Sequence, residues 1–457
     1  MLLTIEKLIY GGDGLARLAQ DEHGRGKAVF MPFVLEGEHV QAEITEEKPG
    51  LARALLEAVV QPSPQRVVPR CPYFGECGGC HYQHSAYDHQ LETKTWILRE
   101  TFRRIAKADL PTDLRVHASP PWNYRNRTRM RVVSSLRAAG DSAAPDNAAS
   151  SASRFVLGYN RFRSDQVLAV RECPISSPLI NRAIAAVWQL GESGAVPGNI
   201  QEIECFANAE DDRLLVELTV AEPQARERRH QEAMAIFARS LRTSLPELAG
   251  TATFTRGRDG RLARVMPPKD LREDFGADEL AYRTASATYR VRAGTFFQTN
   301  RFLTDELVSI AASGASGESA LDLYAGVGLF SVPLSRNFRN VAAVEASPLS
   351  YRDLRRNCPP NLSTHNTTTE KFLAALPKGT HCDSVLVDPP RGGLGERLAR
   401  ALARLNAPRV TYVSCDPATL ARDARVLLGF GYRIEETHLI DLFPQTFHIE
   451  TVLRFMR

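Results

Sequence analysis

The stretch Leu321-Asp322-Leu323-Tyr324-Ala325-Gly326-Val327-Gly328-Leu329-Phe330 decides the fold of the C-terminal part of this 457-residue chain. It is typical of an apolar strand that runs into a glycine turn and then a helix, and its glycines let a ligand approach the backbone closely. Further apolar strands alternate with helical segments after Gly294, at residues 341–345, 384–388 and 410–414. This alternation predicts a mostly parallel α/β sheet.

Two acidic residues follow strands of this predicted sheet. Glu345 comes 19 residues after Gly326, at a strand end where a carboxylate accepts hydrogen bonds from a ribose diol. The turn lacks the third glycine of the dinucleotide fingerprint, so S-adenosylmethionine is favoured over NAD. Asp388 is held by Pro389 and Pro390 after the next strand, and its alternative role is that of a turn or helix cap. Together these features predict a methyl-donor site.

Cys415 follows the apolar strand 409–413 and precedes a predicted helix with Asp416 as its N-cap and Pro417 at its first position. A helix N-terminus or a nearby cation lowers the pKa of a free thiol, which is about 8.5, and so favours the reactive thiolate. The alternative is an inert, packed cysteine. Enzymes that methylate amino groups use a similar Asp-Pro-Pro sequence without a nucleophilic cysteine, so Cys415 favours methylation at carbon.

Methylation of uracil at carbon 5 explains why a thiolate would be needed. Carbon 5 becomes nucleophilic after a thiolate adds to carbon 6, and a base must then remove the carbon 5 proton. In the segment 441–452, His448, Glu450 and Val452 are expected to share one strand face. We favour Glu450 as the base and interpret His448 as a hydrogen-bonded strand residue.

Four cysteines outside this region have metal-ligand spacing. Cys71, Cys77 and Cys80 form C-x5-C-x2-C, and Cys173 supplies a distant fourth thiol before Pro174. Four thiolates suit zinc or an iron-sulfur cluster equally by count. The x5 spacing and the Cys-Pro pair favour a [4Fe-4S] cluster, with zinc as the alternative. The C-x3-C-x2-C pattern of radical enzymes is absent, which disfavours a radical mechanism.

The rest of the chain predicts two further domains. Residues 1–60 alternate apolar and polar positions between glycine turns, including one at 21–26, which predicts a small β-barrel. An amphipathic helix is expected at 87–108 and a β-rich region at 115–289. The Ala- and Ser-rich insert 138–153 suggests a mobile surface loop.

Composition limits the class of protein. A hydrophobic content of 43% and a charged content of 24% are those of a soluble globular protein, and no signal peptide or membrane-length apolar run is present. We therefore expect a cytoplasmic location. A net charge of +4 says little about nucleic acid. Arginines at alternate positions give a stronger indication of nucleic-acid binding. A predicted strand would place four of them on one face, where they could contact RNA phosphates: Arg125, Arg127, Arg129 and Arg131. The alternative is a solvated edge strand.

Together these motifs resemble the RNA uracil-5-methyltransferases that use S-adenosylmethionine, most closely the iron-sulfur branch that modifies 23S ribosomal RNA. The resemblance implies a multidomain α/β plus β fold: an OB-like TRAM domain at 1–62, a central iron-sulfur and RNA-binding domain at 63–290, and a Rossmann-like methyltransferase domain at 291–457. It also implies that the helix at 87–108 packs on the catalytic domain, with Tyr82-Gln83-His84, Gln90 and Lys94 matching the family's pattern after the cluster.

The resemblance assigns roles residue by residue. The segment Phe296-Phe297-Gln298-Thr299-Asn300 is similar to one whose glutamine contacts the methyl donor. The implied donor-binding residues are Gln298, Tyr324, Glu345 and Asp388. Cys415 is then the nucleophile and Glu450 the proton acceptor, and the implied cluster ligands are Cys71, Cys77, Cys80 and Cys173. Leu329 stands where some relatives have asparagine and is left out of the site.

Other functions remain open on sequence alone. Transfer RNA is the second candidate substrate, and we expect a monomer. Two further classes are an RNA-binding module with a structural zinc site and an iron-sulfur redox enzyme. Binding of S-adenosylmethionine and dependence of activity on Cys415 would separate these classes from a methyltransferase.

Overall fold

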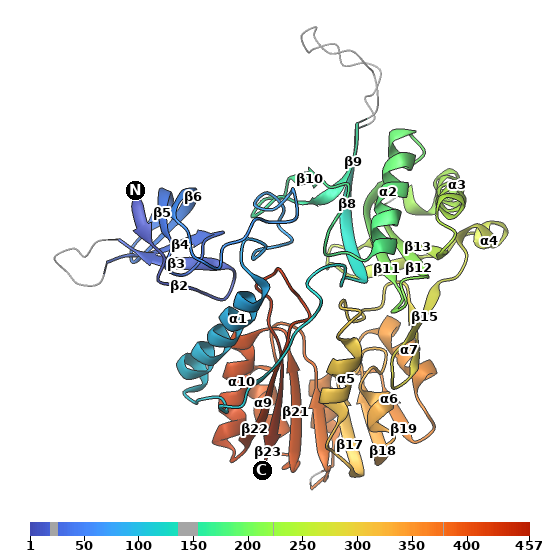
Figure 1. Ribbon diagram of the computed structural model, residues 1–457. Coiled ribbons are helices and arrows are strands. Elements are labelled where there is room, and N and C mark those ends of the chain that lie inside the picture. Colours follow the sequence, from blue (N-terminus) through green and yellow to red (C-terminus); the bar gives the residue numbers. More distant parts are fainter. Residues whose placement is uncertain (19–25, 136–153, 223, 378) are drawn as a thin grey trace.

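The computed structural model describes residues 1–457 except for 19–25, 136–153, 223 and 378 (Figure 1). The proposed mobile insert at 138–153 lies outside the described residues, as does most of the predicted turn at 21–26. The described residues form a six-stranded N-terminal sheet, a seven-stranded central sheet, a two-stranded hairpin and an eight-stranded C-terminal sheet.

The N-terminal sheet has six strands in the order β1-β5-β6-β4-β3-β2. Their bounds are β1 Leu2–Thr4, β2 Lys7–Leu8, β3 Asp13–Arg17, β4 Ala28–Pro32, β5 His39–Lys48 and β6 Leu51–Gln61. Strands β4 and β6 pair in parallel and the other neighbours are antiparallel. Alternate residues such as Ala16, Val29 and Met31 fill the domain's own core. The predicted small β domain is therefore present.

Helix α1 (Tyr87–Thr101) continues into a wider helical turn, η1 (Phe102–Ala106), and packs against the C-terminal domain (Figure 1). Its apolar side chains Ile97, Leu98 and Phe102 share a core with strands and helices of that domain. The fully buried Lys94 Nζ donates to Asp441 Oδ1 at 2.6 Å, and the Tyr87 hydroxyl donates to Oδ2 of the same carboxylate at 3.0 Å. Helix α1 is thus docked on the C-terminal domain.

We expect Lys94→Met to lower the free energy of unfolding by about 3–5 kcal/mol, because it would leave the buried Asp441 carboxylate without its cation. Urea unfolding followed by circular dichroism would measure the loss. The exposed pair Arg103–Asp109 supplies the control, since Arg103→Gln should cost less than about 1 kcal/mol. Equal losses in the two variants would contradict the prediction.

The central sheet has seven strands in the order β10-β9-β8-β11-β12-β13-β14. Their bounds are β8 Arg127–Ser135, β9 Arg154–Asn160, β10 Val167–Ala169, β11 Ile200–Ala207, β12 Leu214–Val220, β13 Leu248–Arg256 and β14 Leu262–Val265. Helices α2 (Pro178–Glu192) and α3 (Arg228–Ser244) pack on it, with a short turn η2 (Gln224–Arg226) between them. The region is β-rich as expected, and it also contains these two helices, which were not predicted.

The predicted arginine face of β8 is only partly exposed, at Arg129 and Arg131. Arg127 is buried and forms ion pairs with Glu204 and Glu217 on neighbouring strands. Arg129 also pairs with Glu204, and Arg125 lies beside the cysteines rather than in solvent. Acidic residues on the adjacent strands thus fix Arg127 within the central domain, whereas contact of the exposed Arg129 and Arg131 with RNA stays a prediction.

A linking segment joins the central and C-terminal sheets. It comprises η3 (Lys269–Leu271), α4 (Arg272–Phe275) and the antiparallel pair β15 (Glu279–Arg283) and β16 (Thr288–Arg292). The hairpin's Tyr282 and Tyr289 are buried with Phe297, which brings the segment 296–300 to the edge of the C-terminal domain.

The C-terminal sheet has eight strands in the order β19-β18-β17-β20-β21-β23-β22-β7. Their bounds are β7 Arg115–His117, β17 Gly317–Leu323, β18 Phe338–Val344, β19 Leu362–His365, β20 Ser384–Val387, β21 Arg409–Ser414, β22 Arg433–Ile440 and β23 Glu450–Met456. The strands from β19 to β21 are parallel, and β23 is antiparallel to both neighbours. The prediction of a mostly parallel α/β sheet is confirmed.

Helices α5 to α10 complete this domain, and helical regions lie on both faces of the sheet (Figure 1). Their bounds are α5 Thr304–Ala312, α6 Ser331–Leu334, α7 Pro348–Asn357, α8 Thr369–Ala375, α9 Gly395–Ala403 and α10 Pro417–Gly429. Within the described residues, no helix is both long and apolar enough to cross a membrane.

Candidate active site

A cavity of about 670 Å³ lies at the carboxyl ends of the parallel strands. Its lining includes every predicted donor-binding and catalytic residue: Gln298, Tyr324, Glu345, Asp388, Cys415 and Glu450. Strands β17, β18, β20 and β21 each deliver one of these residues at or just after their last residue. Parallel strands end at one edge of a sheet, so residues far apart in sequence converge there.

The glycine turn and Glu345 form one end of the cavity. Gly326 N–H donates to Glu345 Oε2 at 2.9 Å, and Ser347 N–H donates to Oε1 at 2.5 Å. Tyr324 and Gly326 both have positive φ, at 67° and 58°, and a Cβ at Gly326 would meet no atom within 4 Å. The turn therefore leaves open space beside an oriented carboxylate. This arrangement fits the ribose of an adenosine ligand.

Glu450 reaches the cavity because β23 runs opposite to β21. Thr451 pairs with Ser414, so the first residue of β23 lies next to the last residue of β21 and the following Cys415. Glu450 is buried, and burial together with the charge of Asp388 raises its pKa well above the usual range. Arg391 opposes this shift. Glu450 therefore holds a proton readily and, once ionised, is a comparatively strong carboxylate base.

Asp388 is a second, half-buried acid in the cavity. Burial, followed by the charge of Asp322, raises the pKa of Asp388 to about 7. Because the charge of Asp388 also disfavours ionisation of Glu450, the two acids are suited to holding and passing a proton at neutral pH.

Cys415 lies on the turn between β21 and α10, as predicted. Asp416 caps the helix by accepting from Ala418 N–H at 3.0 Å and Thr419 N–H at 2.9 Å. The expected lowering of the thiol pKa is wrong: burial, followed by the charge of Glu450, raises the pKa of Cys415 to about 12. The charge of Arg391 lowers the pKa of Cys415, but by less than burial raises it. A cationic ligand in the cavity would favour the thiolate.

This pKa predicts that Cys415 of the ligand-free protein reacts slowly with iodoacetamide at pH 7. The raised pKa favours the thiol, so the thiolate fraction and the alkylation rate should rise about tenfold per pH unit up to a pH near 12. Peptide-resolved mass spectrometry at pH 7, 8 and 9 would measure the rate at this cysteine alone. A rate that levels off below pH 9 would contradict the prediction.

Arg391 and His448 also line the cavity and were not assigned as site residues from sequence. Arg391 Nη2 lies 3.3 Å from His448 Nε2, and burial followed by the charge of Arg391 lowers the pKa of His448 to about 3. His448 precedes β23 and does not belong to it, so the predicted shared strand face with Glu450 is wrong. Arg391 could have been assigned to the site from the sequence, because it directly follows the Asp-Pro-Pro turn.

A second, smaller cavity lies in the central domain. Its lining includes the four cysteines with metal-ligand spacing, Cys71, Cys77, Cys80 and Cys173. Arg125 also lines it, and its buried Nε has no hydrogen-bond partner among the described atoms. In the described residues no three His, Cys, Asp or Glu side chains are grouped closely enough for a single metal ion. The four cysteines share one cavity, and their binding of a metal stays a prediction.

Comparison with known proteins agrees with the fold. Residues 262–457 match the family profile tRNA (Uracil-5-)-methyltransferase, and residues 1–56 match the TRAM domain. The 23S rRNA (uracil(1939)-C(5))-methyltransferase RlmD of Alkalilimnicola ehrlichii is 30% identical over 470 residues, covering 100% of this chain and 96% of the relative. An uncharacterized RNA methyltransferase of Aquifex aeolicus is 29% identical over 458 residues, covering 98% and 97%.

A solved structure shares the architecture. The Pyrococcus abyssi tRNA (uracil-54, C5)-methyltransferase, in complex with S-adenosyl-L-homocysteine, has a TM-score of 0.70 and 24% identity, with 100% of both chains covered. The fold and the cavity thus define a Rossmann-like methyltransferase joined to a TRAM domain. The chain belongs to the RNA uracil-5-methyltransferase family.

Proposed function

We propose that this protein transfers a methyl group from S-adenosylmethionine to carbon 5 of a uridine in 23S ribosomal RNA. The observation that carries this proposal is the convergence of Cys415, Glu450 and Asp388 with the ribose-binding Glu345 on one cavity. A nucleophile, a base and a donor site are the parts that carbon 5 methylation needs. The relatives that match nearly the whole chain and carry a substrate name support 23S rRNA.

The residues divide the reaction between them. Cys415 loses its proton to a neighbouring carboxylate, and its sulfur forms a bond to carbon 6 of uracil while the ring electrons move to the carbon 4 oxygen. When bound, S-adenosylmethionine supplies an electrophilic methyl group to carbon 5. Glu450 then accepts the carbon 5 proton, and the electron pair released breaks the sulfur–carbon 6 bond. Cys415 leaves as thiolate and the 5-methyluracil ring is restored.

The donor pocket orients the reactants. Glu345 would accept from the ribose hydroxyls, while Tyr324 and Gln298 would border the rest of the donor. The flanking walls Phe296 and Phe443 would limit water around the reacting carbon. Asp388, with a pKa of about 7, would hold a proton at the polar edge of the uracil.

We further propose that Cys71, Cys77, Cys80 and Cys173 hold a [4Fe-4S] cluster. The four thiols and the unpartnered Nε of Arg125 face one cavity and suit an anionic polynuclear group. The cluster would stabilise the central domain, because its ligands join the segment before α1 to the segment before α2. Purified protein should absorb broadly in the visible range and bleach on reduction, whereas a colourless zinc protein would contradict the cluster.

Methyl transfer to defined RNAs tests the main proposal. The protein would be incubated with radiolabelled donor and either a 23S rRNA fragment or a transfer RNA transcript, and the product identified as 5-methyluridine by mass spectrometry. We expect label in the ribosomal fragment. Transfer RNA is the second candidate because it appears in the matching family's description. Preferential labelling of transfer RNA would overturn the ribosomal assignment, and no labelling of either would overturn the methyltransferase.

A further inference from the structure

The loop that follows the Asp-Pro-Pro turn is bound to α10, the helix that begins directly after the nucleophile turn. This loop, residues 391–394, carries Arg391 to the catalytic cavity. Arg391 is exposed, so packing does little to fix its position. Its main chain is held by α10 instead, and this helix therefore connects Cys415 to the loop that supplies a guanidinium.

Asp423 is the centre of this attachment. Its side chain is fully buried on α10. Leu394 N–H donates to Asp423 Oδ2 at 2.7 Å, and the Tyr412 hydroxyl donates to the same oxygen at 2.8 Å. Arg422 Nε donates to Asp423 Oδ1 at 2.9 Å. Three donors thus satisfy a carboxylate whose burial without partners would be costly.

Arg422 and Thr419 extend the attachment to the residues nearest the cavity. Arg422 Nη2 donates to the Gly392 oxygen at 2.8 Å, and the Thr419 hydroxyl donates to the Arg391 oxygen at 3.0 Å. Residues 419, 422 and 423 share one face of α10, because residues three or four apart on a helix are neighbours. That face therefore binds the main chain of residues 391, 392 and 394.

Gly393 lets the loop approach the helix this closely. Its φ is 67°, in the left-handed region that favours glycine. A Cβ at Gly393 would lie 2.5 Å from Asp423 Oδ2 and 2.7 Å from Arg422 Nη2. A side chain would push the loop away from both groups, so the absence of one permits the attachment.

Arg391 is the cation that acts on the reacting groups. Its charge opposes the rise in the pKa of Cys415 and in the pKa of Glu450. The other charges that act on the Cys415 thiol are acidic: besides Glu450 they are Asp388 and Asp416. Displacement of Arg391 would therefore leave the thiol with acidic neighbours, which disfavour the thiolate.

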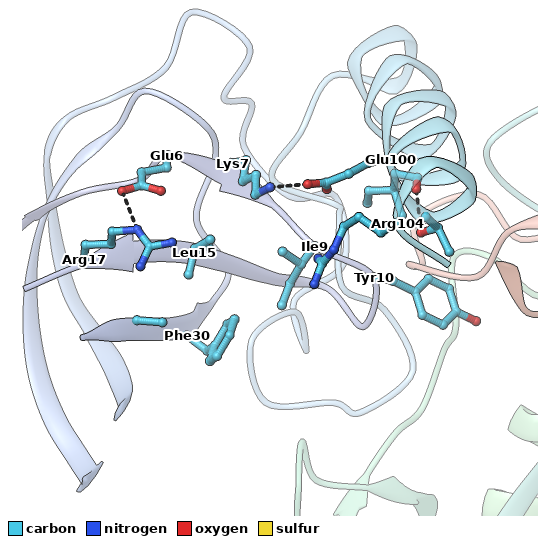
Figure 2. Close-up of a pocket in the computed structure, with 12 residues that line it drawn as sticks. Glu6, Lys7, Ile9, Tyr10, Leu15, Arg17, Phe30, Glu100 and Arg104 are labelled. Atoms are coloured by element: carbon cyan, nitrogen blue, oxygen red, sulfur yellow. Dashed lines mark hydrogen bonds and ion pairs between the residues drawn. The ribbon is translucent and has the colours of Figure 1, made fainter. Parts of the chain in front are cut away.

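Tyr10 contacts the nucleophile turn from the N-terminal domain. It lines the pocket between the N-terminal sheet and α1 (Figure 2), and its hydroxyl donates to the backbone oxygen of Cys415 at 3.3 Å. Burial, followed by the charge of Asp416, raises the pKa of Tyr10 above its ordinary value, so the hydroxyl is uncharged at neutral pH. Tyr10 thus supports the turn without adding a charge.

We propose that Asp423 and Arg422 are positioning residues: they hold Arg391 in the cavity shared by the nucleophile and the base. The inference rests on the proposed function, in which a cation stabilises the thiolate and the carboxylate. Neither positioning residue lines the cavity, so each acts through the main chain of the loop. A cation fixed in advance stabilises charge without reorganisation during the reaction.

Two substitutions loosen the loop by different routes. Arg422→Gln removes the bond to the Gly392 oxygen from a half-exposed position, so the fold should persist. Asp423→Asn keeps an oxygen for the Leu394 and Tyr412 donors, but its NH₂ group would face Arg422 Nε, donor against donor. If Asp423→Asn fails to fold, Arg422→Gln alone decides the test.

Two controls accompany these variants. Arg425→Gln removes an exposed arginine of the same helix. Tyr432→Phe removes a buried hydroxyl that donates to the Ala407 oxygen at 2.9 Å, in the hydrophobic core that Leu394 also joins. Tyr432→Phe should lower thermal stability but leave the bonds of the loop 391–394 intact, so it shows the effect of destabilisation alone.

Alkylation of Cys415 measures the attachment without RNA or methyl donor. Less thiolate should form once Arg391 is loosened, so the rate with iodoacetamide at pH 8 should fall about threefold to tenfold in Arg422→Gln and Asp423→Asn. Hydrogen exchange of the peptide that contains residues 391–394 should become faster in the same variants. Both controls should match wild type in both measurements.

Turnover gives a further readout. With a 23S rRNA fragment, kcat should fall about 10- to 100-fold in both loop variants, whereas KM for S-adenosylmethionine should stay within about twofold. The donor site should be unaffected because Asp388, before the loop, donates its N–H to the Leu323 oxygen at 3.3 Å.

An unchanged alkylation rate or an unchanged kcat in the loop variants would overturn the inference. So would an equal loss of Cys415 alkylation in Tyr432→Phe. If no form of the protein transferred a methyl group but alkylation were still slowed in Arg422→Gln and Asp423→Asn, the proposed reaction would be contradicted while the positioning role would stand.

Discussion

Cys415→Ala is expected to abolish methyl transfer, with a loss on the order of 10⁴-fold or more. Alanine cannot form the bond to carbon 6, and without that bond carbon 5 of uracil lacks the electron density to attack a methyl group. The change removes one sulfur from a half-buried turn whose helix cap is supplied by Asp416, so the fold should persist. Donor binding should remain within a few-fold of wild type, since Glu345 and the glycine turn are untouched.

An RNA that contains 5-fluorouridine at the target position tests directly whether Cys415 is the nucleophile. Fluorine at carbon 5 cannot leave as a proton would, so the wild-type protein should be trapped as a covalent RNA adduct visible on a denaturing gel. Cys415→Ala should form none. Cys358→Ala, which removes a free thiol outside the catalytic cavity, is the control and should form the adduct normally. An adduct that persists in Cys415→Ala would show that another group attacks the base.

The convergence of Glu345, Asp388 and Cys415 could be predicted from the sequence because each of them follows a strand with a clear apolar pattern. Glu345, Asp388 and Cys415 end strands of one parallel sheet, and such ends necessarily meet. The helix cap at Asp416 could also be predicted, because an Asp-Pro pair directly before a helical pattern indicates a helix start from local sequence alone.

Features that depend on neighbours from distant segments could not be predicted in this way. The arginines of β8 alternate as expected, but whether they face RNA or acids depends on Glu204 and Glu217 of other strands. The pKa of Cys415 is raised because burial and Glu450 outweigh the nearby Arg391, a balance set by tertiary packing. The attachment of the loop 391–394 likewise exists only because α10 packs beside that loop.

Glu450→Gln is expected to stop the reaction after the methyl group has been transferred. Glutamine preserves the size of the side chain but cannot accept the carbon 5 proton, so elimination of Cys415 would be blocked and turnover should fall about 10²–10⁴-fold. Unsubstituted RNA should then accumulate as a methylated covalent adduct, which wild type releases. The raised pKa of Glu450 supports this role, because a buried carboxylate that ionises reluctantly is a strong base once ionised.

Mass spectrometry of the denatured protein–RNA adduct would test this arrest by showing whether the trapped base carries a methyl group. Glu435→Gln, an exposed change on the neighbouring strand β22, should turn over normally. His448→Ala separates the two candidate bases: it retains Glu450 and should still release product. If His448→Ala accumulated the methylated adduct while Glu450→Gln turned over normally, the proton would leave through the imidazole. The low pKa of His448, about 3, argues against that outcome, because a neutral imidazole beside Arg391 holds an added proton poorly.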